Sequence, residues 1–207
     1  MKYLLTIFSI ILLIGCTQVL MDDSPPPSKD PVSVEETKTD FKKFFKPDGS
    51  TASFLGEGNE FASYTEKTKW LSDDYVATVI DNGGATTMKI YRVLEDRIDL
   101  IYDELVEEMP NNITYPEVIS LEKLEAIEPY FAGPIEVGTT FGNWEIVETG
   151  ASVDTHFESF ENVIVIEEQQ EDYINRKYLV EGFGVVKAVY TDTNEEYIVT
   201  STLEKLE

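Results

Sequence analysis

Apolar and polar residues alternate along most of the chain after Phe41, a pattern typical of β-strands that bury one face. In the segment 97–102, for example, Ile98 and Leu100 fall on one face of an extended chain, whereas Asp99 falls on the other. We expect strands at 60–70, 75–80, 87–94, 97–102, 144–148, 162–167, 176–180, 184–190 and 197–203.

A hairpin is predicted where the segments 75–80 and 87–94 flank the tetrapeptide Asp81-Asn82-Gly83-Gly84. An Asn-Gly pair between alternating runs favours a tight turn in which both turn residues adopt positive φ. With the neighbouring segments, this hairpin makes an antiparallel meander in the first half of the chain. The second half has the same character, although no sequence repeat relates the two halves.

The segment 105–128 interrupts the alternation, because it is acidic and contains Pro110 and Pro116. Within it, Val118, Leu121, Leu124 and Ile127 recur at helical spacing, which predicts one short helix near 117–127. Strands otherwise dominate. We therefore expect a mainly β fold, in which antiparallel meanders form a sandwich or a curved sheet with one short helix.

The N-terminus carries an export signal. Lys2 is followed by an apolar run over 3–14, which is shorter than the roughly 20 residues of a membrane-spanning helix and fits a secretory signal. The tetrapeptide Leu13–Cys16 (LIGC) resembles the lipobox of bacterial lipoproteins. That resemblance implies cleavage before Cys16 and attachment of a lipid to its thiol, which would hold the protein on the extracytoplasmic face of the cell membrane.

Two other interpretations of the N-terminus remain open. An uncleaved anchor would run on to Met21, but the polar pair Thr17 and Gln18 breaks the apolar run. A plain signal peptide would leave Cys16 incidental, but this is the only cysteine of the chain and it stands where a lipobox requires it.

Three parts of the chain follow from these patterns. Residues 1–15 are the expected signal peptide, and 16–40 the lipidated cysteine with a disordered tether. The tether contains the run Pro25-Pro26-Pro27 among serines and charges, which cannot bury enough apolar surface to fold. Residues 41–207 are expected to form a single β-rich extracytoplasmic domain.

Charge and composition exclude several activities. The chain has 16 basic and 40 acidic residues, a formal net charge of −24, whereas nucleic-acid binding needs a basic surface. A single cysteine leaves no disulfide, and with His156 as the only histidine it leaves no zinc site built on several such ligands. We expect no nucleic-acid partner, no metal and no cofactor.

The segment Gly56–Ala62 (GEGNEFA) is the most distinctive internal motif. Together with Pro134–Gly138 and Gly182–Lys187, it resembles segments of uncharacterised lipoproteins of low-GC Gram-positive bacteria, a resemblance that implies no assigned activity. The glycines favour a structural turn. The alternative is a ligand-binding loop that uses Asn59 and Glu60.

Four other segments have both a structural and a functional interpretation. Asp192–Glu196 is a polar hairpin tip or a weak calcium site, and Glu167–Asp172 is a solvated loop or a source of paired carboxylates. Phe41–Lys46 starts the core with its phenylalanines while its lysines stay solvated, or it touches a membrane or an anionic polymer. His156 is a surface residue or a lone catalytic base.

We expect the anchored domain to be a non-catalytic binding or interaction module, with no catalytic residues and an unknown ligand or envelope protein as its partner. Its contact with the membrane would run through the lipid on Cys16. One alternative is a hydrolase that acts on the cell envelope through carboxylates. Another is an envelope assembly factor.

Overall fold

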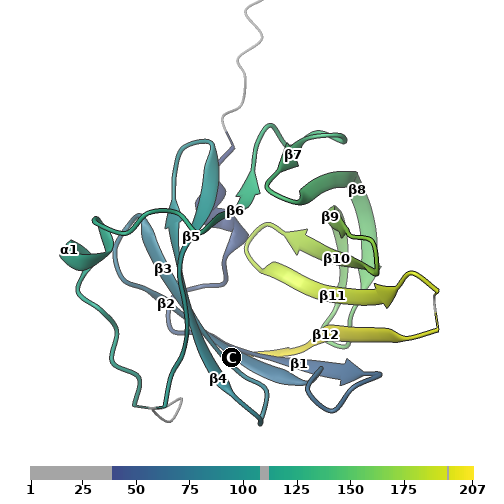
Figure 1. The fold of residues 1–207 in the computed structure, drawn as a ribbon, viewed down its shortest axis with the longest axis horizontal. Helices are drawn as coiled ribbons and strands as arrows, with labels where there is room; N and C mark the ends of the chain where they lie inside the picture. Colours follow the sequence, from purple (N-terminus) through teal and green to yellow (C-terminus); the bar gives the residue numbers. More distant parts are fainter. Residues whose placement is uncertain (1–38, 108–111, 195) are drawn as a thin grey trace, which may run out of the picture. The chain divides into compact units, whose positions relative to one another are not determined.

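The computed structural model describes residues 39–107, 112–194 and 196–207. The described chain contains twelve strands, a 3₁₀-helix and an α-helix of four residues, shown in Figure 1. Their bounds are η1 (Phe41–Phe44), β1 (Thr51–Glu57), β2 (Tyr64–Trp70), β3 (Tyr75–Asp81), β4 (Thr86–Val93), β5 (Arg97–Leu105), α1 (Val118–Leu121), β6 (Glu128–Ala132), β7 (Thr140–Phe141), β8 (Trp144–Asp154), β9 (Ser159–Gln169), β10 (Tyr173–Val180), β11 (Gly184–Asp192) and β12 (Ile198–Leu206).

All twelve strands belong to one antiparallel sheet, in the order β6-β5-β4-β3-β2-β1-β12-β11-β10-β9-β8-β7. The sheet consists of two meanders, β1–β6 and β7–β12, which pair through β1 and β12. It curls until its two edge strands meet, where the ring centroids of Phe131 in β6 and Phe141 in β7 lie 5.8 Å apart. The fold class is therefore confirmed as a nearly closed, curved sheet.

The sequence pattern did not predict three of the strands, which are β1, β6 and β7. The edge strands β6 and β7 are short, and β6 contains Pro129, which lacks the N–H of a ladder and is confined to sheet edges. β1 buries only Ala52 and Phe54 on one face, a weak alternation. The segment expected at 60–70 begins as a strand only at Tyr64, because 60–62 belong to the turn before it.

The hairpin of β3 and β4 is confirmed, but its turn differs from the predicted one. Gly83 has φ of 79°, whereas Asn82 keeps a negative φ. The Asn82 side chain instead closes the turn, since its Oδ1 accepts hydrogen bonds from the backbone N–H of Gly84 at 3.0 Å and of Ala85 at 2.9 Å.

The predicted helix is confirmed near 117–127 but is a single turn, α1. Its Leu121 is buried with Tyr75, Val79 and Ile90, on the face of β3, β4 and β5 that points away from the interior of the curl. The segment around α1 therefore covers the outer face of the first meander. Among the described residues, no helix is long and apolar enough to cross a membrane.

The 3₁₀-helix η1 connects the two meanders at one end of the curl. The Phe44 ring lies 4.8 Å from that of Phe131 in β6, and the Lys43 carbonyl accepts a hydrogen bond from the Gly182 N–H between β10 and β11. Gly184 has φ of 63°, and a Cβ there would lie 2.6 Å from the Phe44 carbonyl oxygen. Only glycine permits this close packing.

Candidate functional site

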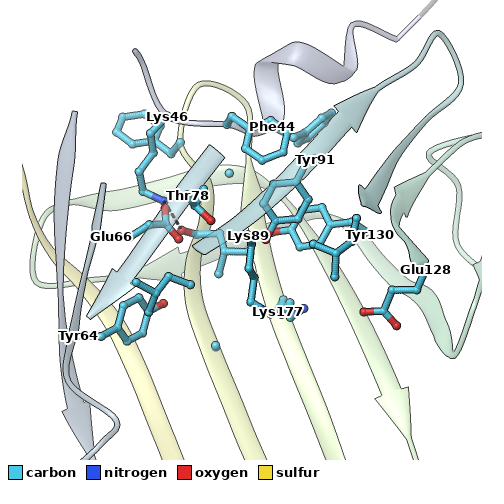
Figure 2. Close-up of a pocket in the computed structure, with 17 residues that line it drawn as sticks. Phe44, Lys46, Tyr64, Glu66, Thr78, Lys89, Tyr91, Glu128, Tyr130 and Lys177 are labelled. Carbon is cyan, nitrogen blue, oxygen red and sulfur yellow. Dashed lines mark hydrogen bonds and ion pairs between the residues drawn. The ribbon is translucent and has the colours of Figure 1, made fainter. Parts of the chain in front are cut away.

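The interior of the curled sheet contains a cavity of about 220 Å³. Its walls come from both meanders: β2 to β6 supply one side, β10 and β11 the other, and the residues after η1 complete it. Figure 2 shows the polar and aromatic side chains around this hollow. These side chains face the cavity because every second residue of each strand points into the curl.

One lysine of the cavity, Lys46, is paired with a carboxylate. The Lys46 side chain is only 3% exposed, and its Nζ lies 2.8 Å from Glu66 Oε1, a contact drawn as a dashed line in Figure 2. The same ammonium group donates to the Val185 carbonyl of β11 at 3.2 Å and lies 5.2 Å from the centroid of the Phe54 ring. Lys46 thus connects the two meanders through hydrogen bonds.

A second lysine in the cavity has a different environment. Lys177 of β10 makes no hydrogen bond or ion pair in the described chain, and its Nζ contacts aromatic faces instead. The Nζ lies 4.1 Å from the centroid of the Trp144 ring and 5.2 Å from that of the Tyr130 ring. Such cation–π contacts are worth about 0.5–2 kcal/mol, less than the cost of removing an ammonium ion from water.

The environment of Lys177 makes its positive form costly. Burial in the cavity, followed by the like charge of Lys89, lowers the pKa of Lys177 to about 8. Glu128 and Glu168 raise this pKa, but with smaller effects. Lys89 is itself paired, with its Nζ 2.8 Å from Asp103 Oδ2.

The cavity also holds neutral hydroxyl groups. Burial raises the pKa values of Tyr64, Tyr91 and Tyr130, so that all three remain protonated donors. The Thr78 hydroxyl is buried beside that of Tyr91 and lowers its pKa against the larger effect of burial, but the contact falls short of hydrogen-bond geometry. The Thr78 hydroxyl is therefore left without a hydrogen-bond partner in the described chain.

A shallow hollow of about 200 Å³ adjoins the cavity beyond Lys177. Lys177 and Ala188, which are partners in the pairing of β10 with β11, line both spaces. Trp144, Asn175 and other residues of β8 to β12 line the second space. Lys177 therefore lines both the cavity and the groove that adjoins it.

The two residues predicted from the sequence to bind a ligand lie away from the cavity. Asn59 and Glu60 are exposed in the turn between β1 and β2, where the Asn59 amide donates to the Tyr197 hydroxyl at 3.0 Å. Asn59 Oδ1 also accepts from the Phe61 N–H at 2.7 Å, which is the role of a turn-closing side chain. The structure does not bring Asn59 or Glu60 to the cavity. Cys16 lies outside the described residues.

The other nominated residues are also remote from the cavity. His156 is exposed in the turn between β8 and β9. Asp192 Oδ1 accepts a hydrogen bond from the Tyr197 N–H at 2.8 Å, and residue 195 of the same turn lies outside the described residues. Glu167 pairs with Arg176 across β9 and β10. Among the described residues, no three acidic, histidine or cysteine side chains are grouped to hold a metal ion.

Sequence reasoning missed the two lysines of the cavity. Lys46 was grouped with Lys42 and Lys43 as solvated, and the structure confirms exposure for the latter two only. Lys177 had one signal, since it shares the inward face of its strand with the fully buried Leu179. That signal is weak in an isolated sequence, because it depends on knowing which face of the strand is buried.

Comparisons with known proteins extend to the fold only. No protein-family model and no curated protein matches the chain. A candidate lipoprotein from Parabacteroides distasonis matches with a TM-score of 0.53 and 12% identity, over 82% of this chain and 100% of that chain. A candidate exported protein with a YmcC-like fold from Bacteroides fragilis has a TM-score of 0.49 and 11% identity, over 79% of this chain and 98% of that chain. The first of these similarities shows a shared fold.

Proposed function

We propose that this protein is a lipid-anchored extracytoplasmic module that binds a small ligand inside its curled sheet and performs no catalysis. The observation that carries the proposal is Lys177, a half-buried cation in the cavity wall that has aromatic contacts but no hydrogen bond or ion pair in the described chain. Charged groups with shifted pKa values are often found at functional sites, where binding or catalysis uses the unfavourable environment of the charge.

Non-catalytic binding is favoured over the carboxylate hydrolase. That mechanism needs one carboxyl group that holds a proton and a second that is ionised, with both facing the substrate. The cavity offers Glu66 and Glu128, but Glu66 is committed to Lys46 at 2.8 Å. With Glu66 held by Lys46, the cavity leaves only Glu128 as an unpaired carboxylate for a substrate in the described chain.

The anchored location is supported by the lipobox at Leu13–Cys16 and agrees with the name of the structure from Parabacteroides distasonis. We expect Cys16→Ser to abolish retention in the membrane fraction by lipid. The measurement is fractionation of cells that express either form, with the mass of the mature chain. A Cys16→Ser chain of mature length that only detergent releases from the membrane would contradict the anchor.

Ligand binding in the cavity is tested by nuclear magnetic resonance with a fragment library, on the chain from Thr17 onward. This chain contains every residue that the structure describes. Bound fragments should shift the amide signals of inward-facing residues, and Ala188→Trp, which fills the cavity, should remove those shifts. Lys187→Trp, on the opposite face of β11, is the matched control. Shifts confined to outer faces, or insensitive to Ala188→Trp, would contradict the proposal.

A further inference from the structure

The cavity concentrates positive charge in an acidic protein. Lys46, Lys89 and Lys177 all line it, although the chain has only 16 basic residues against 40 acidic ones. Two carboxylates, Glu66 and Glu128, also line it. The sign of charge that a ligand should carry depends on which of these groups are already paired.

Two of the three lysines are neutralised within the protein. Lys46 pairs with Glu66 and Lys89 pairs with Asp103, each at 2.8 Å. Lys177 remains, with only aromatic contacts to its ammonium group. A cationic ligand would meet the like charge of Lys177 here, whereas an anionic group would supply the ion pair that Lys177 lacks.

The rest of the lining is suited to an apolar body. Phe44, Phe45, Tyr91 and Leu100 belong both to the walls of the cavity and to the main apolar cluster of the interior. A cavity of about 150 Å³ holds a benzene molecule. The volume of about 220 Å³ therefore suits a body of roughly ten non-hydrogen atoms or one end of a longer chain, by that comparison.

We infer that the ligand has a short apolar body and one anionic group, a carboxylate or a phosphate, and that Lys177 receives that group. This inference rests on the proposed binding function and adds the chemical class of the ligand. The anionic group lies at the junction with the adjoining groove, so that a longer ligand continues along Trp144 and Asn175. Glu128 lines the same cavity, and its negative charge opposes that of an incoming anion.

The test uses four probes with the same eight-carbon chain, titrated by calorimetry into the chain from Thr17 onward. Octanoate and octyl phosphate are anionic, octanol is neutral and octylammonium is cationic. We expect the anionic probes to bind at least about tenfold more tightly than octanol, and octylammonium to bind most weakly. The stronger of octanoate and octyl phosphate shows which of these two anionic groups the site prefers.

Two variants separate the role of Lys177 from general charge. Lys177→Met should weaken the anionic probes by at least about tenfold and leave octanol within about twofold. Lys187→Met, which removes a lysine from the opposite face of the neighbouring strand, should leave all four probes unchanged. Binding of octanoate that survives Lys177→Met, or that equals the binding of octanol, would overturn the inference.

The failure of the inference is distinguishable from failure of the proposed function. If none of the four probes binds but other fragments shift inward-facing residues that Ala188→Trp blocks, the protein binds ligands of another class and only the inference fails. If no fragment reaches the cavity, the proposed function fails as well.

Discussion

Lys46 and Lys177 line the same cavity, yet the protein treats the two cations in opposite ways. Lys46 has a carboxylate partner and a backbone carbonyl acceptor, each on a different meander. Lys177 has two aromatic faces and no acceptor in the described chain. A buried charge with a carboxylate partner supports the fold, whereas a half-buried charge without an acceptor is a cost that binding can remove.

The largest expected effect is a loss of stability when Lys46 is replaced. Lys46→Met leaves Glu66 buried without its partner, and we expect a loss of about 3–5 kcal/mol in the free energy of unfolding. Urea denaturation measures it. The matched control is the double variant Lys46→Met/Glu66→Leu, which removes both charges and should recover most of the loss. A single variant within about 1 kcal/mol of the parent would show that the pair is well solvated.

A change in stability of the opposite sign is expected when Lys177 is replaced. Lys177→Met replaces a poorly solvated ammonium group by an apolar chain of similar length, so the variant should be more stable than the parent by about 1–2 kcal/mol. The same denaturation experiment measures it at pH 7. If the variant is less stable than the parent, the aromatic contacts stabilise the cation fully and the contrast between the two lysines fails.

The advantage of Lys177→Met should depend on pH. The pKa of Lys177 is about 8 in the folded chain, below its ordinary value of 10.5 in the unfolded chain. Below pH 8 both states carry the charge and the folded state bears its full cost. As pH rises from 8 to 10.5, the folded chain loses the proton first, so the parent gains stability relative to the variant.

Denaturation of both proteins between pH 6.5 and 10.5 tests this dependence. The stability difference should be largest at the acid end and should shrink towards the alkaline end. A difference that stays constant across this window would mean that Lys177 keeps its proton on folding as readily as in water.

The smallest expected effect concerns Glu128, the carboxylate that shares the cavity with Lys177. Glu128→Gln removes a charge that opposes an incoming anion, so octanoate should bind about two- to fivefold more tightly, as expected for charges at high effective dielectric. Calorimetry measures the dissociation constant. Glu125→Gln, a change in the loop before β6, serves as the control and should have no effect.

Local sequence patterns were sufficient for the fold class but not for the site. Alternation of buried and exposed residues marks strands such as β3 and β4, whose hairpin also has Gly83 as a local signal. Lys177 meets Tyr130 of β6 and Trp144 of β8, and these contacts depend on how far the whole sheet curls. No pattern within a single strand encodes that curvature.

Asn59 and Glu60, the residues predicted to bind a ligand, show the opposite case: a local structure that the sequence does reveal. Its glycine-rich setting was visible in the sequence because a turn is a local structure, and the hydrogen bonds of Asn59 serve that turn. The burial of Lys46 is hidden from the sequence for a related reason. Its neighbours Lys42 and Lys43 are exposed, and only the register of β1 beside β2 places Lys46 next to Glu66.

The meeting of β6 and β7 gives the sheet a mechanical asymmetry. Every other neighbouring pair of strands is held by a ladder of hydrogen bonds, whereas these two end strands are in contact through the rings of Phe131 and Phe141 and through Pro129 against Gly142. Apolar surfaces can slide without leaving a donor or acceptor unpaired. β6 and β7 can therefore separate without breaking any of the eleven hydrogen-bonded ladders that join the described strands.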